Sequence, residues 1–405
     1  MIGDRRGAVR GLAGIILLGA IGGGGAAAAC EAEPAAFQAA LTGYLEERSE
    51  AEGITAASAT IACAGDSAPV VVTAGTRGRD DPTPIDAATM FQIGSNTKHV
   101  TAALLALLAE DGALSLDDTV GDHLPQYPFW ADVSIRALLD MTSPIPTYSE
   151  VPAFMAAYAA HPEAHHTLEE LVDVVVPDNA PDLPPNTPWF YSNTNYILAG
   201  MIIEAVTGET YETVLQKRII APLGLTGTRY FPEAVPGAVQ EGMAHGYFEN
   251  PACDLYAPDC ETASLAPLVG KDVRGFDLSW AGPAGGIIST PTDLAAWVRA
   301  LFGGKVMSAA MLGEMTRMVS MKTGEPIADV SAEDPRGFAL GLVRIYAPET
   351  GAFWFYQGET LGYRAVFAWF ADDDVLITFA LNSQPPEDEN HAQSLATDLY
   401  RLATR

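Results

Sequence analysis

The chain is short of basic residues. Its 405 residues include 22 lysines and arginines against 51 aspartates and glutamates, which gives a formal net charge of −29. A surface this acidic repels nucleic acid and anionic lipid headgroups, so neither is expected as a partner. A solvated acidic surface that favours solubility is enough to explain the excess.

Long apolar runs are also scarce. The apolar stretch at residues 11–22 is too short to span a bilayer comfortably, and no later stretch is long enough for a transmembrane helix. Arginines precede this stretch, and small residues follow it at 26–29, which is the pattern of a secretory signal peptide over residues 1–29. The sequence therefore predicts an exported protein, periplasmic or secreted.

Cysteine is rare, with four residues in the whole chain. An even count in an exported protein suggests disulfides, and Cys253 and Cys260 flank a turn-rich loop that would let them pair, which leaves Cys30 for Cys63. Alternatively, Cys30 directly follows the alanines at 26–29 and would carry a lipid anchor. Neither a C-x-x-C spacing nor a nearby histidine pair accompanies these cysteines, so we expect no metal site.

Hydrophobic periodicity indicates helices and strands in three blocks. A helix over 34–51 and strands over 57–63 and 70–74 come first, and a mainly helical middle follows. β-branched and aromatic residues then predict further elements, namely strands at 338–345, 352–357, 363–370 and 375–381 and a closing helix at 387–402.

This order predicts an α+β fold. The simplest packing is one mainly antiparallel sheet formed by residues 30–90 and 336–405 and flanked by terminal helices. The mainly helical segment 91–335 is inserted between its strands, with the active site at the junction.

One stretch, residues 91–98, carries the pattern of a nucleophile. Ser95 and Lys98 are three residues apart, so on a helix they share one face. Gly94 precedes the apolar run, which places Ser95 near the helix N-terminus, where free N–H groups favour negative charge. A serine, a nearby amine and backbone donors suit nucleophilic catalysis. An ordinary amphipathic helix with a surface serine and lysine is the alternative.

Two further stretches stand out. Tyr191 and Asn193 lie two residues apart and face the same way in an extended segment; a tyrosine beside a lysine can act as a base, since a nearby cation lowers its pKa. An aromatic plug followed by a helix cap is the alternative. The segment from Tyr356 to Glu359 joins two predicted strands, and its Gly358 lets a ligand approach the backbone closely, or simply belongs to a hairpin.

Together, these stretches resemble the penicillin-recognising serine hydrolases in order and spacing. That superfamily includes class C β-lactamases, serine-type D-alanyl-D-alanine carboxypeptidases and related esterases, and S-x-x-K is one of its signatures. Three more segments are similar to the family pattern, at residues 134–139, 222–226 and 285–290.

The resemblance implies a role for each site residue. Ser95 is the acylated nucleophile, and Lys98 with Tyr191 forms the base that activates it and relays the proton to the leaving group. Asn193 hydrogen-bonds the acyl part of the substrate. The backbone N–H groups of Ser95 and Glu359 form the oxyanion hole, and no cofactor is required.

The third segment departs from the family pattern. Relatives usually carry Lys or His, then Thr, Ser or Gly, then Gly, whereas this chain has Tyr356, Gln357 and Gly358. The cation that helps to hold a substrate carboxylate is missing there, and Arg364 is a candidate to supply it. Some esterases of the family carry an aromatic residue at this position.

These features rank the substrates. An ester or small amide comes first, a D-alanyl peptide of cell-wall type second and a β-lactam third. A non-catalytic binding protein on the same fold is the alternative of another class, and such a protein would be expected to have lost its catalytic residues.

Overall fold

The computed structural model describes residues 30–64, 66, 68–177, 183, 187–250 and 265–404. The predicted signal peptide and the pair Cys253 and Cys260 therefore lie outside the described residues. None of the helices within these ranges is long and apolar enough to cross a membrane.

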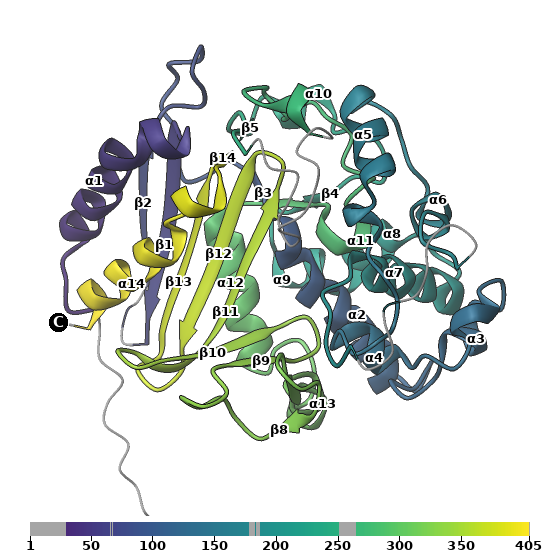
Figure 1. The fold of residues 1–405 in the computed structure, drawn as a ribbon. Helices are drawn as coiled ribbons and strands as arrows, with labels where there is room; N and C mark the ends of the chain where they lie inside the picture. Colours follow the sequence, from purple (N-terminus) through teal and green to yellow (C-terminus); the bar gives the residue numbers. More distant parts are fainter. Residues whose placement is uncertain are drawn as a thin grey trace, which may run out of the picture.

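A nine-stranded antiparallel sheet forms one half of the molecule (Figure 1). Its strand order is β2-β1-β13-β12-β11-β10-β9-β7-β8, and β-branched and aromatic residues fill its long central strands. The strands are β1 (Ala56–Cys63), β2 (Val70–Gly75), β7 (Met318–Ser320), β8 (Pro326–Ile327), β9 (Arg336–Phe338), β10 (Val343–Ala347), β11 (Gly351–Thr360), β12 (Tyr363–Phe370) and β13 (Val375–Leu381).

Two terminal helices cover the outer face of this sheet. These are α1 (Pro34–Glu52) and α14 (Ala392–Ala403), and they lie side by side against it in Figure 1. Phe37 and Leu41 of α1 pack with Leu395 and Leu399 of α14 in one apolar cluster on the sheet. The α+β class predicted from the sequence is confirmed.

The other half is mainly helical and packs on the inner face of the sheet (Figure 1). Its helices are α2 (Thr97–Glu110), α3 (Val120–His123), α4 (Ile135–Leu139), α5 (Pro152–Ala160), α6 (Leu168–Asp173), α7 (Asn193–Thr207), α8 (Tyr211–Leu215), α9 (Ala221–Leu223), α10 (Gly237–Gln240), α11 (Gly282–Gly285), α12 (Pro291–Phe302) and α13 (Ala309–Met315). Nearly every side chain of α2 is buried, which makes it the central helix of this half.

Short strands also lie in the middle of the chain, where strand signals are scarce. They are β3 (Phe91–Gln92), β4 (Arg229–Tyr230), β5 (Tyr247–Phe248), β6 (Ile287–Ser289) and, near the chain end, β14 (Ser383–Gln384), which form two small sheets. The main sheet also takes in β7 and β8, which the predicted division assigns to the inserted segment. The sheet and the helical half are therefore interleaved along the chain.

Two predicted elements have different bounds. The strand expected at 338–345 is a hairpin of β9 and β10, because Gly341 turns the chain with a φ of 71°. A Cβ at this position would lie 2.8 Å from the carbonyl oxygen of Lys98, so the turn packs directly on α2. The closing helix begins at Ala392, since Pro385 and Pro386 lead into a separate short turn at 387–389.

A disulfide joins Cys30 to Cys63, as the sequence predicted. It ties the segment before α1 to the end of β1. With its sulfur in this bond, Cys30 has no thiol left for a lipid anchor, which corrects that alternative. Disulfides persist in oxidising compartments, so this bond is consistent with export.

Candidate active site

Ser95 lies in a tight turn between β3 and α2. The turn is the short 3₁₀ helix η1 (Gly94–Asn96). Ser95 therefore lies two residues before Thr97, the first residue of α2. Gly94 has a φ of 51°, and a Cβ there would lie 2.5 Å from the backbone nitrogen of Glu359. Glycine is therefore required twice over, by conformation and by the close approach of β11.

Gly358 brings β11 equally close to this turn. A Cβ on Gly358 would overlap the carbonyl oxygen of Ile93. The space where a side chain would lie at this position is taken by the chain itself, and the approach of a ligand to the backbone here stays a prediction. The contact sets the Glu359 backbone beside the nucleophile turn.

The Lys98 side chain is fully buried and lies within hydrogen-bond distance of three oxygens. Its Nζ is 3.1 Å from Ser95 Oγ, 2.6 Å from Asn193 Oδ1 and 2.7 Å from the Ala284 carbonyl oxygen. Burial lowers the pKa of Lys98 well below its usual value, and no carboxylate among the described residues forms an ion pair with it.

An ammonium could donate to all three oxygens, but burial favours the neutral amine, which these contacts also fit. A neutral lysine has two N–H bonds, and the Asn193 and Ala284 oxygens accept both. The remaining lone pair then faces the Ser95 hydroxyl. The arrangement can take the serine proton, which a charged ammonium cannot do.

Tyr191 is the second group on the nucleophile. Its Oη lies 2.7 Å from Ser95 Oγ, and Lys98 Nζ lies 4.8 Å from the centre of its ring. Ser95, Lys98 and Tyr191, which the sequence placed in one site, therefore come together within hydrogen-bond reach. The Tyr356 hydroxyl lies 3.3 Å from the Tyr191 hydroxyl, where relatives usually have a cation.

Asn193 begins α7 and holds Lys98. Its Oδ1 accepts from Lys98, its Nδ2 donates to Ser149 Oγ at 2.8 Å, and its backbone N–H donates to Thr147 Oγ1 at 3.0 Å. The predicted role was a hydrogen bond to the acyl part of the substrate. Its Oδ1 is used to position Lys98, and the hydrogen bond from its Nδ2 to a substrate stays a prediction.

His99 follows Lys98 but is enclosed by aromatic rings. Trp297 donates to its Nδ1 at 2.8 Å, and burial lowers the pKa of His99 to about 3. Its ring packs edge-on against Tyr356 at 6.1 Å. The imidazole is therefore neutral and supports the Tyr356 ring.

Gln357 and Glu359 project together from β11. The Glu359 carboxylate accepts hydrogen bonds from Gln357 Nε2, from Asn390 Nδ2 at 3.0 Å and from Gln384 Nε2 at 3.3 Å. All three donors are neutral amides. They orient the carboxylate without cancelling its charge.

A cavity of about 70 Å³ opens beside Ser95. Ser95 and Asn193 lie on its wall, and its described lining includes Glu150 and Glu359 but neither lysine nor arginine. Apolar side chains complete it, including Trp280. A cavity of this charge favours a cationic group over an anionic one.

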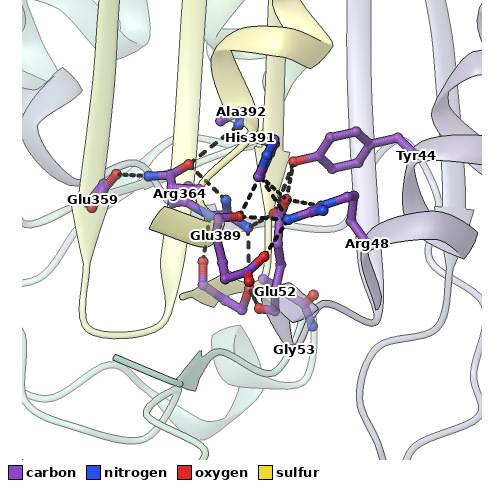
Figure 2. A network of polar contacts seen from close by, with 12 residues as sticks. Tyr44, Arg48, Glu52, Gly53, Glu359, Arg364, Glu389, His391 and Ala392 are labelled. Atoms are coloured by element: carbon purple, nitrogen blue, oxygen red, sulfur yellow. Dashed lines mark hydrogen bonds and ion pairs between the residues drawn. The ribbon is translucent and has the colours of Figure 1, made fainter. Parts of the chain in front are cut away.

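Arg364 does not supply a cation to the site, which corrects that expectation. It is fully buried, and its Nη2 donates to Glu52 Oε2 at 2.6 Å and its Nε to the Ser383 carbonyl at 2.9 Å. Its Nη1 donates to Asn390 Oδ1 at 3.0 Å. Figure 2 shows this network between α1 and the sheet.

The sequence did not indicate two contributors to the site. One is the Ala284 carbonyl, which accepts from Lys98 and lies in α11, just before the family-like segment 285–290. The other is Glu150, in a short turn after Tyr148. Neither carries a local signal, because a carbonyl has no side-chain identity and an isolated glutamate in an acidic chain is usually solvated.

Comparisons with known proteins agree with this geometry. A family model described as beta-lactamase matches residues 43–401. Penicillin-binding protein 4* of Bacillus subtilis is 26% identical over 77% of the chain, and an unguisins hydrolase of Aspergillus violaceofuscus is 30% identical over 56%. The chain spans 64% and 38% of the lengths of these two relatives.

Solved structures cover more of the chain. A D-stereospecific amidohydrolase from Streptomyces sp. is 30% identical, with a TM-score of 0.68 over 87% of this chain and 94% of that one. A D-amino acid amidase from Ochrobactrum anthropi, complexed with D-phenylalanine, is 25% identical, with a TM-score of 0.72 over 91% of this chain and 97% of that one.

Proposed function

The chain belongs to the beta-lactamase family, and on that basis we propose that it is an exported serine amidohydrolase for small amides whose acyl part carries a free amino group. The observation that carries the proposal is the acidic character of the cavity beside Ser95, whose described lining includes Glu150 and Glu359 and no basic residue. A protonated amine is stabilised there, whereas a substrate carboxylate is repelled.

The solved relatives support the same substrate class. The Streptomyces protein is a D-stereospecific amidohydrolase, and the Ochrobactrum protein is a D-amino acid amidase complexed with D-phenylalanine. We therefore place D-aminoacyl amides ahead of the esters that head the sequence-based ranking together with small amides. D-alanyl peptides with a blocked amino group and β-lactams follow, because both bring a carboxylate and no cation.

The proposed first step forms an ester on Ser95. Lys98 and Tyr191 accept the serine proton as Oγ attacks the substrate carbonyl carbon. The backbone N–H groups of Ser95 and Glu359 stabilise the oxyanion. The tyrosine hydroxyl, 2.7 Å from Ser95 Oγ, then hands a proton to the departing nitrogen as the amide bond breaks. Water hydrolyses the resulting ester by the reverse proton path.

The test is parallel turnover of matched substrates by the purified protein. We expect kcat/KM to be highest for D-phenylalanine amide and lower for the L isomer. N-acetyl-D-phenylalanine amide, a p-nitrophenyl ester and a chromogenic cephalosporin complete the panel. Acetylation removes the cation and should lower kcat/KM roughly tenfold or more. Ser95→Ala should abolish every activity.

Two variants test whether the preference for a free amino group depends on the acidic residues of the cavity. Glu150→Gln and Glu359→Gln keep the size of each side chain and remove its charge, so each should narrow the difference between the free and the acetylated amide. Equal turnover of both amides, or fastest turnover of the cephalosporin, would contradict the proposal.

A further inference from the structure

A second cavity is lined by Tyr191. Its volume is about 300 Å³, larger than the cavity beside Ser95. Trp189, Tyr191, Phe338 and Tyr356 form an aromatic wall, with Trp189 and Phe338 5.5 Å apart between ring centres. The wall is apolar enough to hold a side chain, and it includes Tyr191, whose hydroxyl contacts Ser95.

Arg336 stands at this second cavity. Its side chain is exposed, and no hydrogen bond or ion pair of its guanidinium is found among the described residues. Most of the described arginines pair with a carboxylate; Arg77 and Arg229 do not, but both donate to backbone carbonyls. Arg344, on the neighbouring strand, shows the common case, since Asp329 accepts from it at 2.6 and 3.1 Å.

The two cavities divide the substrate at its scissile bond. Ser95 and Asn193 line the first cavity, so the acyl part lies there. Tyr191 lines the second. The proton that leaves Ser95 must reach the departing nitrogen, and Tyr191 is the group placed to deliver it. The leaving group therefore lies against Tyr191 and extends into the second cavity.

We infer that this second cavity binds a leaving group that is itself an amino acid, with an apolar side chain against the aromatic wall and a free carboxylate at Arg336. The inference rests on the proposed function and names its substrate: a short peptide with a free N-terminus and a free C-terminus, instead of a simple amide. The amide C–N bond breaks, the acyl carbon bonds to Ser95 Oγ, and the amino acid departs with the serine proton on its nitrogen.

The charges of the two cavities match such a dipeptide. Its ammonium end meets Glu150 and Glu359, and its carboxylate end meets Arg336. The hydroxyl of Tyr356 lies 3.3 Å from that of Tyr191, but Tyr356 has no cationic group. The cation that binds the carboxylate is therefore Arg336, at another place on the cavity wall. A simple amide leaves ammonia and would use none of this second cavity.

The experiment compares three probes: D-phenylalanine amide, D-Phe-D-Phe amide and D-Phe-D-Phe with a free carboxylate. We expect the free acid to have a kcat/KM roughly tenfold above the dipeptide amide, the usual size of a hydrogen bond to a charged group. Arg336→Gln should remove this difference and leave turnover of D-phenylalanine amide unchanged. Arg336→Lys should restore part of it.

Arg344→Gln is the matched control, because it removes an arginine from the adjacent strand that is already paired with Asp329. It should leave the preference for the free acid intact. Equal kcat/KM for the two dipeptides in the wild type, or an equal effect of Arg336→Gln on all three probes, would overturn the inference while the proposed function stands. Absence of turnover for every probe would overturn both.

Discussion

Lys98 and Arg364 are both basic residues with fully buried side chains, and their surroundings are opposite. Arg364 meets the carboxylate of Glu52, a backbone carbonyl and an amide oxygen. Lys98 meets a hydroxyl, an amide oxygen and a carbonyl, with no carboxylate. The first environment stabilises a positive charge, whereas the second one disfavours it.

The two surroundings give the two residues different roles: Arg364 stabilises the fold, and Lys98 takes part in catalysis. Glu52 also accepts from the Tyr44 hydroxyl at 2.8 Å and from Arg48 Nε at 3.1 Å, so the Arg364 network joins α1 to the sheet (Figure 2). The same network reaches Glu359 through Asn390. Lys98 instead gains reactivity from the missing partner, because a lysine that loses its proton easily can serve as a base.

The largest expected effect is on catalysis, in Lys98→Met. This variant keeps an unbranched buried side chain but removes the amine, so kcat/KM should fall at least about 1,000-fold. The free energy of unfolding should change by no more than about 2 kcal/mol, since two buried oxygens lose one donor. Turnover and urea denaturation measure the two quantities. Activity within tenfold of the wild type would show that Lys98 is not the base.

The next effect is on stability, in Arg364→Met. Removing one partner of a buried ion pair leaves Glu52 as an uncompensated charge and should cost about 3–5 kcal/mol. Chemical denaturation measures this loss. Arg48→Met is the control, because Arg48 is 19% exposed and its pairing should contribute less than about 1 kcal/mol.

A double variant, Arg364→Met with Glu52→Met, sharpens the test. It removes both charges and should recover much of the stability that the single change loses. If Arg364→Met alone were as stable as the wild type, the network would not hold α1 to the sheet.

The sequence predicted that Lys98 lies beside Ser95, and it misplaced Arg364. Helical spacing places Lys98 one turn from Ser95, and the family resemblance adds Tyr191; the structure brings all three side chains together. Arg364 lies on a strand. Strand alternation says which face a side chain takes, but its partner, Glu52, is 312 residues away in sequence.

Other misses have the same cause. The Gly341 turn that splits the strand expected at 338–345 exists because the chain packs there on Lys98 and His99 of α2. Arg336, at the second cavity, lies in no motif that the sequence reveals. It stands out because no carboxylate among the described residues pairs with it. The α+β class, by contrast, follows from the order of strongly patterned segments, which long-range contacts do not alter.

The smallest expected effect is a pH dependence that only one of the two residues can have. Catalysis needs neutral Lys98, so kcat/KM should rise about tenfold per pH unit below its lowered pKa and level off before pH 10.5, the ordinary lysine value.

The same pKa shift affects stability. At pH values below the pKa of Lys98 in the folded protein, folding must bury a protonated lysine. Between the two pKa values the unfolded chain holds the extra proton, so the free energy of unfolding rises with pH across this window. The difference in stability between wild type and Lys98→Met isolates this contribution, and a difference that does not change with pH would mean that Lys98 keeps an ordinary pKa in the folded protein. Arg364 stays charged throughout, and its variant should show the same loss at every pH in this range.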